Sequence, residues 1–203
     1  MASAKRELVG FSTSVSADDM LAGYRRGMFP MGEAGVLYHW WSPDPRGVLP
    51  LENLRVPRSL RKSMRRYRLT FDTEFEAVLG RCADPQRPGG WIDAGLATAY
   101  LELHHRGNAH SVEVWSASGE LVGGLFGVNI GGFFAGESMF HSAVDASKVA
   151  LVGLVERLRQ ATGPVLLDTQ WRTDHLTTLG VVEVPRKRYL RMLAAAVDLP
   201  NAL

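Results

Sequence analysis

The pattern of apolar and polar residues changes near residue 107. Before that point, apolar residues recur at helical spacing between turns rich in proline, glycine and aromatic residues. The helices predicted in this part cover residues 18–24, 56–67, 74–82 and 94–106. A short strand beginning at residue 37 is predicted to run into a turn broken by prolines.

Beyond residue 107 the segments alternate or are continuously apolar, and Ser-Gly and Gly-Gly pairs separate them. The strands predicted there cover residues 111–115, 121–130, 133–140 and 165–169, and the first three form an antiparallel meander. The helical segments predicted there cover residues 146–160, 174–179 and 186–197. This order of elements predicts an α+β fold from about residue 95 onward.

Capping residues set the expected ends of these helices. Ser16 and Asp145 stand where N-caps would, and Pro57 would occupy a first helical turn. Thr73 and Glu76 have the spacing of a capping box.

Composition and charge narrow the class of protein. The 203 residues suffice for one large domain, or for one domain with a small companion, and a net charge of +2 leaves nucleic-acid binding to a local patch. A single cysteine, Cys82, cannot form an intramolecular disulfide, and a buried thiol is favoured over a nucleophile. Residues 1–10 lack the apolar run of a signal peptide, and no stretch reaches the ~18 apolar residues of a membrane span. A cytoplasmic protein is therefore expected.

One predicted helix is strongly basic. Arg58, Arg61, Lys62 and Arg65 share a face, and Arg66 extends the charge. Like charges at this spacing cost a few tenths of a kcal/mol per pair, so an anionic partner such as a phosphate backbone is one interpretation. A solvated surface is the other interpretation.

Three polar positions in apolar strands are candidates for chemistry. Glu137 is either exposed on the outer face of its strand or held in a site. Asp168 and Gln170 should share one face at the end of theirs, where active-site groups are common, although a turn motif would also explain them. His175 in the next helical turn is more typical of a structural residue.

Trp40, Trp41 and Trp91 lie in otherwise polar loops, where core packing competes with stacking on a base. The sequence contains no Cys/His spacing typical of a metal site, no phosphate-binding loop and no Gly-x-Ser-x-Gly motif.

Several of these segments together resemble the leucyl/phenylalanyl-tRNA–protein transferases. The matching segments, in the family's order, are 21–30 (LAGYRRGMFP), 41–46 (WSPDPR), 56–61 (VPRSLR), 109–113 (AHSVE), 121–124 (LVGG), 136–140 (GESMF), 146–148 (ASK) and 167–170 (LDTQ). The resemblance implies a small N-terminal domain, residues 1–70, and an acetyltransferase-like (GNAT) domain, residues 71–203. It also implies the transfer of leucine or phenylalanine from tRNA to a protein that begins with Arg or Lys, which marks that protein for degradation (the N-end rule).

The same resemblance assigns roles to individual residues. The catalytic group it implies is Asp168, Gln170 and Glu137. The apolar aminoacyl pocket it implies is Leu125, Phe134, Leu151, Leu158 and Leu167. Trp41 and Trp91 match aromatic residues near the terminal adenosine, and the basic helix matches the tRNA-binding cluster. The expected partners are aminoacyl-tRNA, with methionine as a third donor, and acceptor proteins; no membrane, metal or cofactor is expected, and the chain should be a monomer.

Two other functions compete with this one. An acetyl-CoA-dependent N-acetyltransferase would need a glycine-rich loop before the long helix, and residues 141–145 contain no glycine. A non-catalytic RNA-binding module would explain the basic helix but not Glu137, Asp168 and Gln170 beside an apolar pocket.

Overall fold

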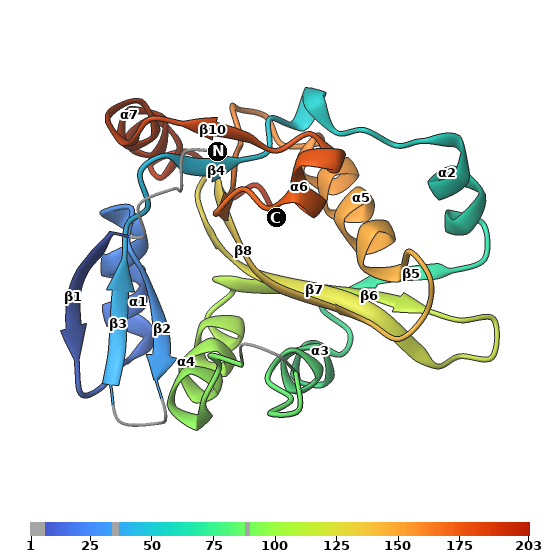
Figure 1. Ribbon diagram of the computed structural model, residues 1–203, viewed down its shortest axis with the longest axis horizontal. Coiled ribbons are helices and arrows are strands. Elements are labelled where there is room, and N and C mark those ends of the chain that lie inside the picture. The colour runs from blue at the N-terminus through green and yellow to red at the C-terminus, as the bar shows by residue number, and fades with distance from the viewer. Residues whose placement is uncertain (1–6, 34–36, 88–89) are drawn as a thin grey trace.

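The computed structural model describes residues 7–33, 37–87 and 90–203, which form a small sheet and a large one (Figure 1). The small antiparallel sheet has the order β1 (Leu8–Ser12), β3 (Leu37–Trp41), β2 (Phe29–Glu33). Helix α1 (Ala17–Arg25) connects β1 to β2 along the chain. A capping box between Ser16 and Asp19 satisfies backbone N–H groups at the N-terminus of that helix.

The large sheet has seven strands. Their order across the sheet is β10 (Val182–Val184), β4 (Arg46–Val48), β9 (Leu166–Gln170), β8 (Phe133–His141), β7 (Leu121–Ile130), β6 (Ala109–Trp115) and β5 (Arg68–Phe71). All neighbours are antiparallel except β8 and β9, which helix α5 (Ala146–Leu158) connects.

Helices cover both faces of this sheet (Figure 1). Helix α5, with α2 (Arg58–Met64) and α6 (Asp174–Leu179), lies on one face. Helices α3 (Phe75–Cys82) and α4 (Ala94–His105) lie on the other, and α7 (Arg186–Ala196) packs near the β10 edge. Each face has its own cluster of buried apolar side chains. A 3₁₀ turn, Leu51–Asn53, connects β4 toward α2.

The strands β8 and β9 separate soon after they begin to pair. Their parallel pairing covers residues 133–135 and 166–168. Beyond these residues, β8 continues beside β7, and β9 continues beside β4. Because the strands no longer pair there, residues 136–139 and 169–170 line an open space. This split in the sheet creates the site described below.

The structure confirms the predicted α+β fold with a small N-terminal unit, and it confirms the long helix and the meander. The prediction that Thr73 caps α3 is wrong, because Glu74 occupies the N-cap position and the Thr73 hydroxyl donates to the buried Glu113 carboxylate. Asp145 does occupy the N-cap of α5, but its carboxylate binds Ser63 and Lys148 and does not bind the helix backbone.

Strand β4 lies within the first 70 residues and β5 crosses residue 70, and both belong to the large sheet. The division into separate domains at residues 1–70 and 71–203 stays a prediction.

Cys82 is buried, as expected, and burial raises the pKa of its thiol to about 11. Within the described ranges no helix is long and apolar enough to cross a membrane; the first six residues, part of the segment predicted not to be a signal peptide, lie outside those ranges.

Candidate active site

A cavity of about 260 Å³ opens where β8 and β9 separate. Its walls come from the two strands, from β7 and from the apolar face of α5, and α6 closes one side. The lining residues are Leu125, Phe126, Gly136, Glu137, Ser138, Met139, Leu151, Leu154, Leu167, Thr169, Gln170, Thr173, His175 and Leu176. Seven of the fourteen have apolar side chains, and the polar ones come from β8, from β9 and from the α6 side.

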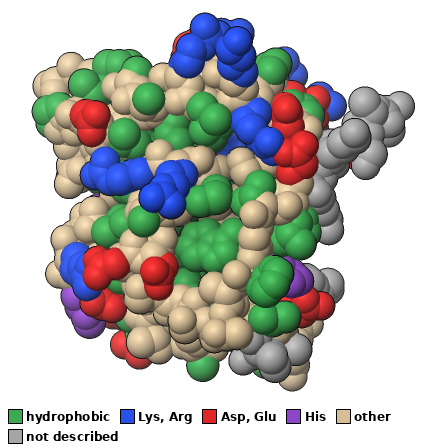
Figure 2. Space-filling view, turned by 90° about the vertical axis from the view of Figure 1, so that its left-hand side faces the viewer, with side chains coloured by type: hydrophobic (Ala, Val, Ile, Leu, Met, Phe, Trp, Pro, Cys, Tyr) green, Lys and Arg blue, Asp and Glu red, His purple; other side chains and the backbone are tan. Residues whose placement is uncertain are grey.

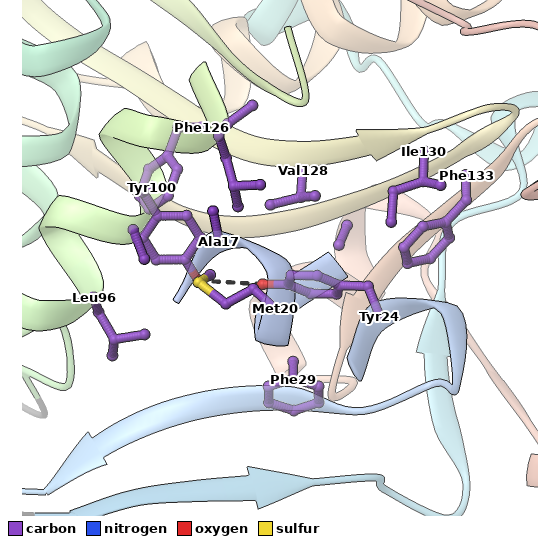
Figure 3. Close-up of a cluster of buried hydrophobic side chains, with 14 of the residues drawn as sticks. Ala17, Met20, Tyr24, Phe29, Leu96, Tyr100, Phe126, Val128, Ile130 and Phe133 are labelled. Carbon is purple, nitrogen blue, oxygen red and sulfur yellow. Dashed lines mark hydrogen bonds between the residues drawn. The ribbon is translucent and has the colours of Figure 1, made fainter. Parts of the chain in front are cut away.

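Glu137 is held by two donors. The Tyr100 hydroxyl donates to Oε2 at 2.8 Å, and the Gln170 side-chain amide donates to Oε1 at 3.2 Å. Tyr24 supports Tyr100 through a hydroxyl–hydroxyl contact of 3.2 Å between α1 and α4 (Figure 3). The small N-terminal unit thus reaches the carboxylate through α1.

Burial raises the pKa of Glu137 to about 7. The hydrogen bonds from Tyr100 and Tyr24 lower this pKa, the negative charge of Asp168 raises it, and the positive charge of Arg46 lowers it. A carboxyl with this pKa is present in both protonation states near neutral pH, which is a property of many functional sites.

This pKa predicts a specific dependence of folding stability on pH. The folded state holds the Glu137 proton up to about pH 7, whereas an unfolded carboxyl loses it near 4.5. The unfolding free energy should therefore fall as pH rises from about 4.5 to 7, by up to about 1.4 kcal/mol per unit. Glu137→Gln should remove this fall, so the wild-type-minus-variant difference in urea unfolding should decline between pH 5 and pH 8. A difference that stays constant over that range would show that Glu137 titrates as in the unfolded chain.

Gln170 ends β9 in a left-handed backbone conformation, with φ of 57°. This conformation is uncommon for a residue with a side chain and costs about 1–2 kcal/mol. The Gln170 backbone N–H donates to Asp168 Oδ1 at 2.8 Å, which holds the turn in place. The turn directs the Gln170 side chain to Glu137 and to the cavity.

Thr169 adds a hydroxyl group to the cavity wall. Its Oγ1 is buried, and it has no hydrogen-bond partner among the residues that the structure describes. A buried hydroxyl without a partner costs free energy, so a ligand in this cavity that bonds to Thr169 would recover part of that cost.

Asp168 lies behind the cavity in a buried ion pair. Arg46 Nε donates to its two oxygens at 2.9 and 3.1 Å, and Nη2 donates at 2.7 Å. The Tyr189 hydroxyl adds a further bond of 2.8 Å. Arg46 Nη1 also donates to the Gly27 carbonyl oxygen, at 3.0 Å. Burial alone would lower the pKa of Arg46, but the charge of Asp168 and its hydrogen bonds raise it, so the guanidinium keeps its positive charge.

The structure brings together part of the predicted site. Leu125, Leu151, Leu167, Glu137 and Gln170 all line the cavity. Asp168, Phe134 and Leu158 do not line it.

Asp168 is fully enclosed by Arg46 and Tyr189, so it supports the backbone of Gln170 without touching the cavity. Phe134 lies where β8 and β9 are still paired, and its ring is packed into the closed core. Leu158 is one turn beyond the cavity-lining Leu154 and is likewise in the closed core. Phe134 and Leu158 therefore do not line this cavity, and their place in an aminoacyl pocket stays a prediction.

The two tryptophans predicted near the adenosine lie outside the cavity. Trp41 lines a separate open cleft with Trp171, and the centres of their rings are 6.3 Å apart. Trp91 packs edge-on against Tyr100 at 6.3 Å, and its carbonyl oxygen accepts a bond from the Gly32 N–H. Trp41 thus contacts the residue that follows Gln170, and Trp91 contacts the tyrosine that binds Glu137. The role of both tryptophans toward adenosine stays a prediction.

The predicted basic cluster is a surface feature of α2 and the turn after it. Its residues are Arg58, Arg61, Lys62, Arg65 and Arg66, all exposed and none in an ion pair with a described carboxylate. Helix α2 is at the opposite end of the molecule from the small sheet (Figure 1). On the face over that sheet, basic and acidic side chains form separate small groups between apolar ones (Figure 2).

Sequence reasoning missed four residues of this site: Arg46, Tyr24, Tyr100 and Thr169. The partners of the first three are distant along the chain; 122 residues separate Arg46 from Asp168, and 76 separate the two tyrosines. Among the described residues, no three His, Cys, Asp or Glu side chains come together as metal ligands would.

The structure thus places an apolar cavity beside a carboxylate–amide pair, and an exposed cationic helix elsewhere on the surface. Two family models match the chain: the leucyl/phenylalanyl-tRNA protein transferase N-terminal domain over residues 13–44, and leucyl/phenylalanyl-tRNA protein transferase over residues 48–194. The chain belongs to this family.

Individual relatives agree with this assignment. A leucyl/phenylalanyl-tRNA–protein transferase of Pseudomonas fluorescens (strain Pf0-1) is 49% identical over 96% of this chain and 87% of its own length. One of Stutzerimonas stutzeri (strain A1501) is 50% identical over 90% of this chain and 82% of its own length. Among solved structures, L-PGS from Bacillus licheniformis aligns with 83% of this chain and 57% of its own at 13% identity, with a TM-score of 0.39 that is too low to bear on the fold.

Proposed function

We propose that this protein transfers leucine or phenylalanine from its tRNA to the α-amino group of a protein that begins with Arg or Lys. The product is a peptide bond made without the ribosome, and the extended protein is marked for degradation. The observation that carries the proposal is the apolar cavity that ends at Glu137 and Gln170, in a chain that belongs to the transferase family. We propose further that the enzyme acts as a monomer.

The cavity supports a choice of donor by apolar volume. Leu125, Leu151 and Leu167 offer no charge or hydrogen bond to the aminoacyl side chain. A charged side chain would lose its hydration there, at a cost of several kcal/mol, whereas leucine, phenylalanine and methionine would gain from burial. Smaller aliphatic groups should bind more weakly by about 1–3 kcal/mol per missing methylene.

The chemistry requires positioning more than a strong base. The donor is an ester, and an α-amino group with a pKa near 8 is about one-tenth deprotonated at pH 7. The amine nitrogen bonds to the ester carbonyl carbon, the bond from that carbon to the ribose oxygen breaks, and the amine's extra proton ends on that oxygen.

Glu137 and Gln170 fit two parts of this reaction. The Gln170 side-chain amide has two hydrogens, one of which binds Glu137, so the other is available to the developing oxyanion. Ionised Glu137 would attract the incoming ammonium and hold the acceptor beside the ester. Asp168, clamped by Arg46, would act as a positioning residue that fixes the left-handed turn at Gln170.

An acetyltransferase-like (GNAT) origin of the large sheet is part of the proposal. The parallel crossover from β8 through α5 to β9, with the site where these strands separate, supports it. An acetyl-CoA-dependent reaction is less well supported, because the loop at residues 141–145 before α5 has no glycine to approach a pyrophosphate.

The test of the proposed function uses labelled leucyl-tRNA and a short peptide that begins with Arg. We expect labelled peptide, and none when the same peptide carries an N-terminal acetyl group. A peptide that begins with Asp should be a poor acceptor, because Glu137 would repel it. Absence of label on the Arg peptide, or equal labelling of the acetylated control, would refute aminoacyl transfer to protein N-termini.

The basic cluster leads to a separate prediction. Arg61→Ala combined with Arg65→Ala should weaken tRNA binding and reduce the slope of log affinity against log salt by roughly one to two units. The matched control is Arg188→Ala with Arg191→Ala, which removes two exposed arginines of α7. A filter-binding titration at several salt concentrations measures both. An unchanged slope in the α2 variant, or an equal change in the α7 control, would contradict the assignment.

A further inference from the structure

A second cavity, of about 420 Å³, adjoins the first and shares Met139 and His175 with it. Its remaining wall comes from the end of α3 and the loop that follows, and from the segment between β8 and α5. Proposed catalytic residues are not among its lining, so this cavity is distinct from the site of transfer.

The α3 side of this cavity carries two arginines without carboxylate partners. The guanidinium of Arg81 lies over the ring of Phe140, 5.5 Å from its centroid. Arg87 donates to the carbonyl oxygens of Cys82 and Met139, at 2.9 and 2.8 Å. These bonds orient Arg87 but do not neutralise its charge. Neither arginine forms an ion pair within the described ranges.

The α5 side adds further donors. Ser147, in the first turn of the 13-residue helix α5, is buried, and its hydroxyl lies 3.3 Å from Nδ1 of His141. Burial lowers the pKa of His175, and the nearby positive charges of Lys148 and His141 lower it further. Lys148 is itself paired with the Asp145 carboxylate at 2.9 Å, so the positive charge here that lacks a carboxylate partner comes from Arg81 and Arg87 among the described residues. The lining also includes one carboxylate, that of Asp84, which accepts a bond from the Gln86 N–H.

The segment between the lining residues Ser142 and Ser147 is hydrogen-bonded to α2 and the turn after it. Ser63 of α2 donates to the Asp145 carboxylate at 2.9 Å, and the Tyr67 hydroxyl donates to the Val144 carbonyl oxygen at 2.8 Å. The second cavity thus shares the segment 142–147 with the surroundings of α2, and it shares Met139 and His175 with the apolar cavity. A nucleic acid that follows the basic surface to the ester would pass it.

We propose that the second cavity binds a backbone phosphate of the donor's 3′ end, namely the 5′ phosphate of the nucleotide that carries the aminoacyl group. This inference rests on the proposed function. A phosphate would satisfy the unpaired charges of Arg81 and Arg87 and could accept from Ser147 at the start of α5. An acceptor that begins with Arg or Lys does not fit here, because its charge would meet cations of the same sign.

The experiment compares two minimal donors, leucyl-adenosine and the same molecule with a 5′ phosphate, at low salt with the Arg-initiated peptide. In the wild-type protein the phosphate should raise kcat/KM by about tenfold or more, as one charge-assisted contact would. Arg81→Gln should bring the ratio between the two donors close to one. Because each ratio is taken within one variant, a general loss of activity cancels.

The matched control is Arg157→Gln. Its guanidinium also lies over an aromatic ring, that of Phe71 at 5.8 Å, but outside this cavity, so it should keep the wild-type ratio. Equal use of the two donors by the wild-type protein, no transfer from the phosphorylated donor, or an unchanged ratio in Arg81→Gln would overturn the phosphate site. If leucyl-tRNA itself supports no transfer, the proposed function fails, and this inference fails with it; if leucyl-tRNA is active, a failure here concerns the phosphate site alone.

Discussion

Replacing Gln170 by glycine should lower the rate of leucyl transfer by roughly 10²–10³, the usual effect of removing one donor to an oxyanion. The fold should not suffer from this change. Gln170 has a φ of 57°, a conformation that glycine adopts without strain, so the variant should be at least as stable as the wild type. Loss of activity without loss of stability separates a catalytic role from a structural one.

Single-turnover transfer and urea unfolding, measured on the same preparations, test this prediction. Gln170→Asn is the matched second variant, because asparagine tolerates the left-handed conformation and keeps an amide, but its side chain is one methylene shorter. We expect it to be nearly as slow as the glycine variant. A glycine variant with near-normal transfer would remove Gln170 from the reaction.

Replacing Arg46 by alanine should lower the unfolding free energy by about 3–5 kcal/mol, because it leaves the Asp168 carboxylate buried without its counter-ion. Tyr189 would remain as a donor to Asp168 but carries no charge. The pair fixes the turn at Gln170, so the folded fraction of this variant should also transfer more slowly.

Urea unfolding of Arg46→Ala beside Arg25→Ala provides the comparison. Arg25 forms an exposed ion pair with Asp198 at 3.7 Å, and such pairs contribute little. Similar losses of unfolding free energy in the two variants would show that the buried pair stabilises the fold no more than an exposed pair does. A second variant, Arg46→Met with Asp168→Leu, replaces the pair by apolar groups and should recover part of the stability while leaving transfer impaired.

The elements that sequence predicts well here are those with a local signal. Helix α6 has its predicted bounds, because Gly180 ends it in a left-handed conformation. The strands β4 and β10 were not predicted, since three residues are too few to show an alternating pattern, and their pairing is set by the large sheet.

The site shows the same division between local and distant information. The pattern at Glu137 left exposure and function equally open, and the separation of β8 from β9 decides that this residue faces a cavity. The partnership of Arg46 with Asp168 depends on segments 122 residues apart, which no local spacing reveals. Alternation along β9 predicted that the Asp168 and Gln170 side chains share one face. The left-handed turn at Gln170 instead directs the amide to Glu137, while Asp168 binds the backbone.

The central claim is that the aminoacyl group of the donor occupies the cavity between β8, β9 and α5. A crystal structure with a non-hydrolysable leucyl-adenosine analogue measures this directly. The account predicts the leucyl side chain among Leu125, Leu151 and Leu167, with the carbonyl oxygen within hydrogen-bond distance of the Gln170 amide. An analogue bound with its leucyl group outside this cavity, or with its carbonyl away from Gln170, would contradict the account.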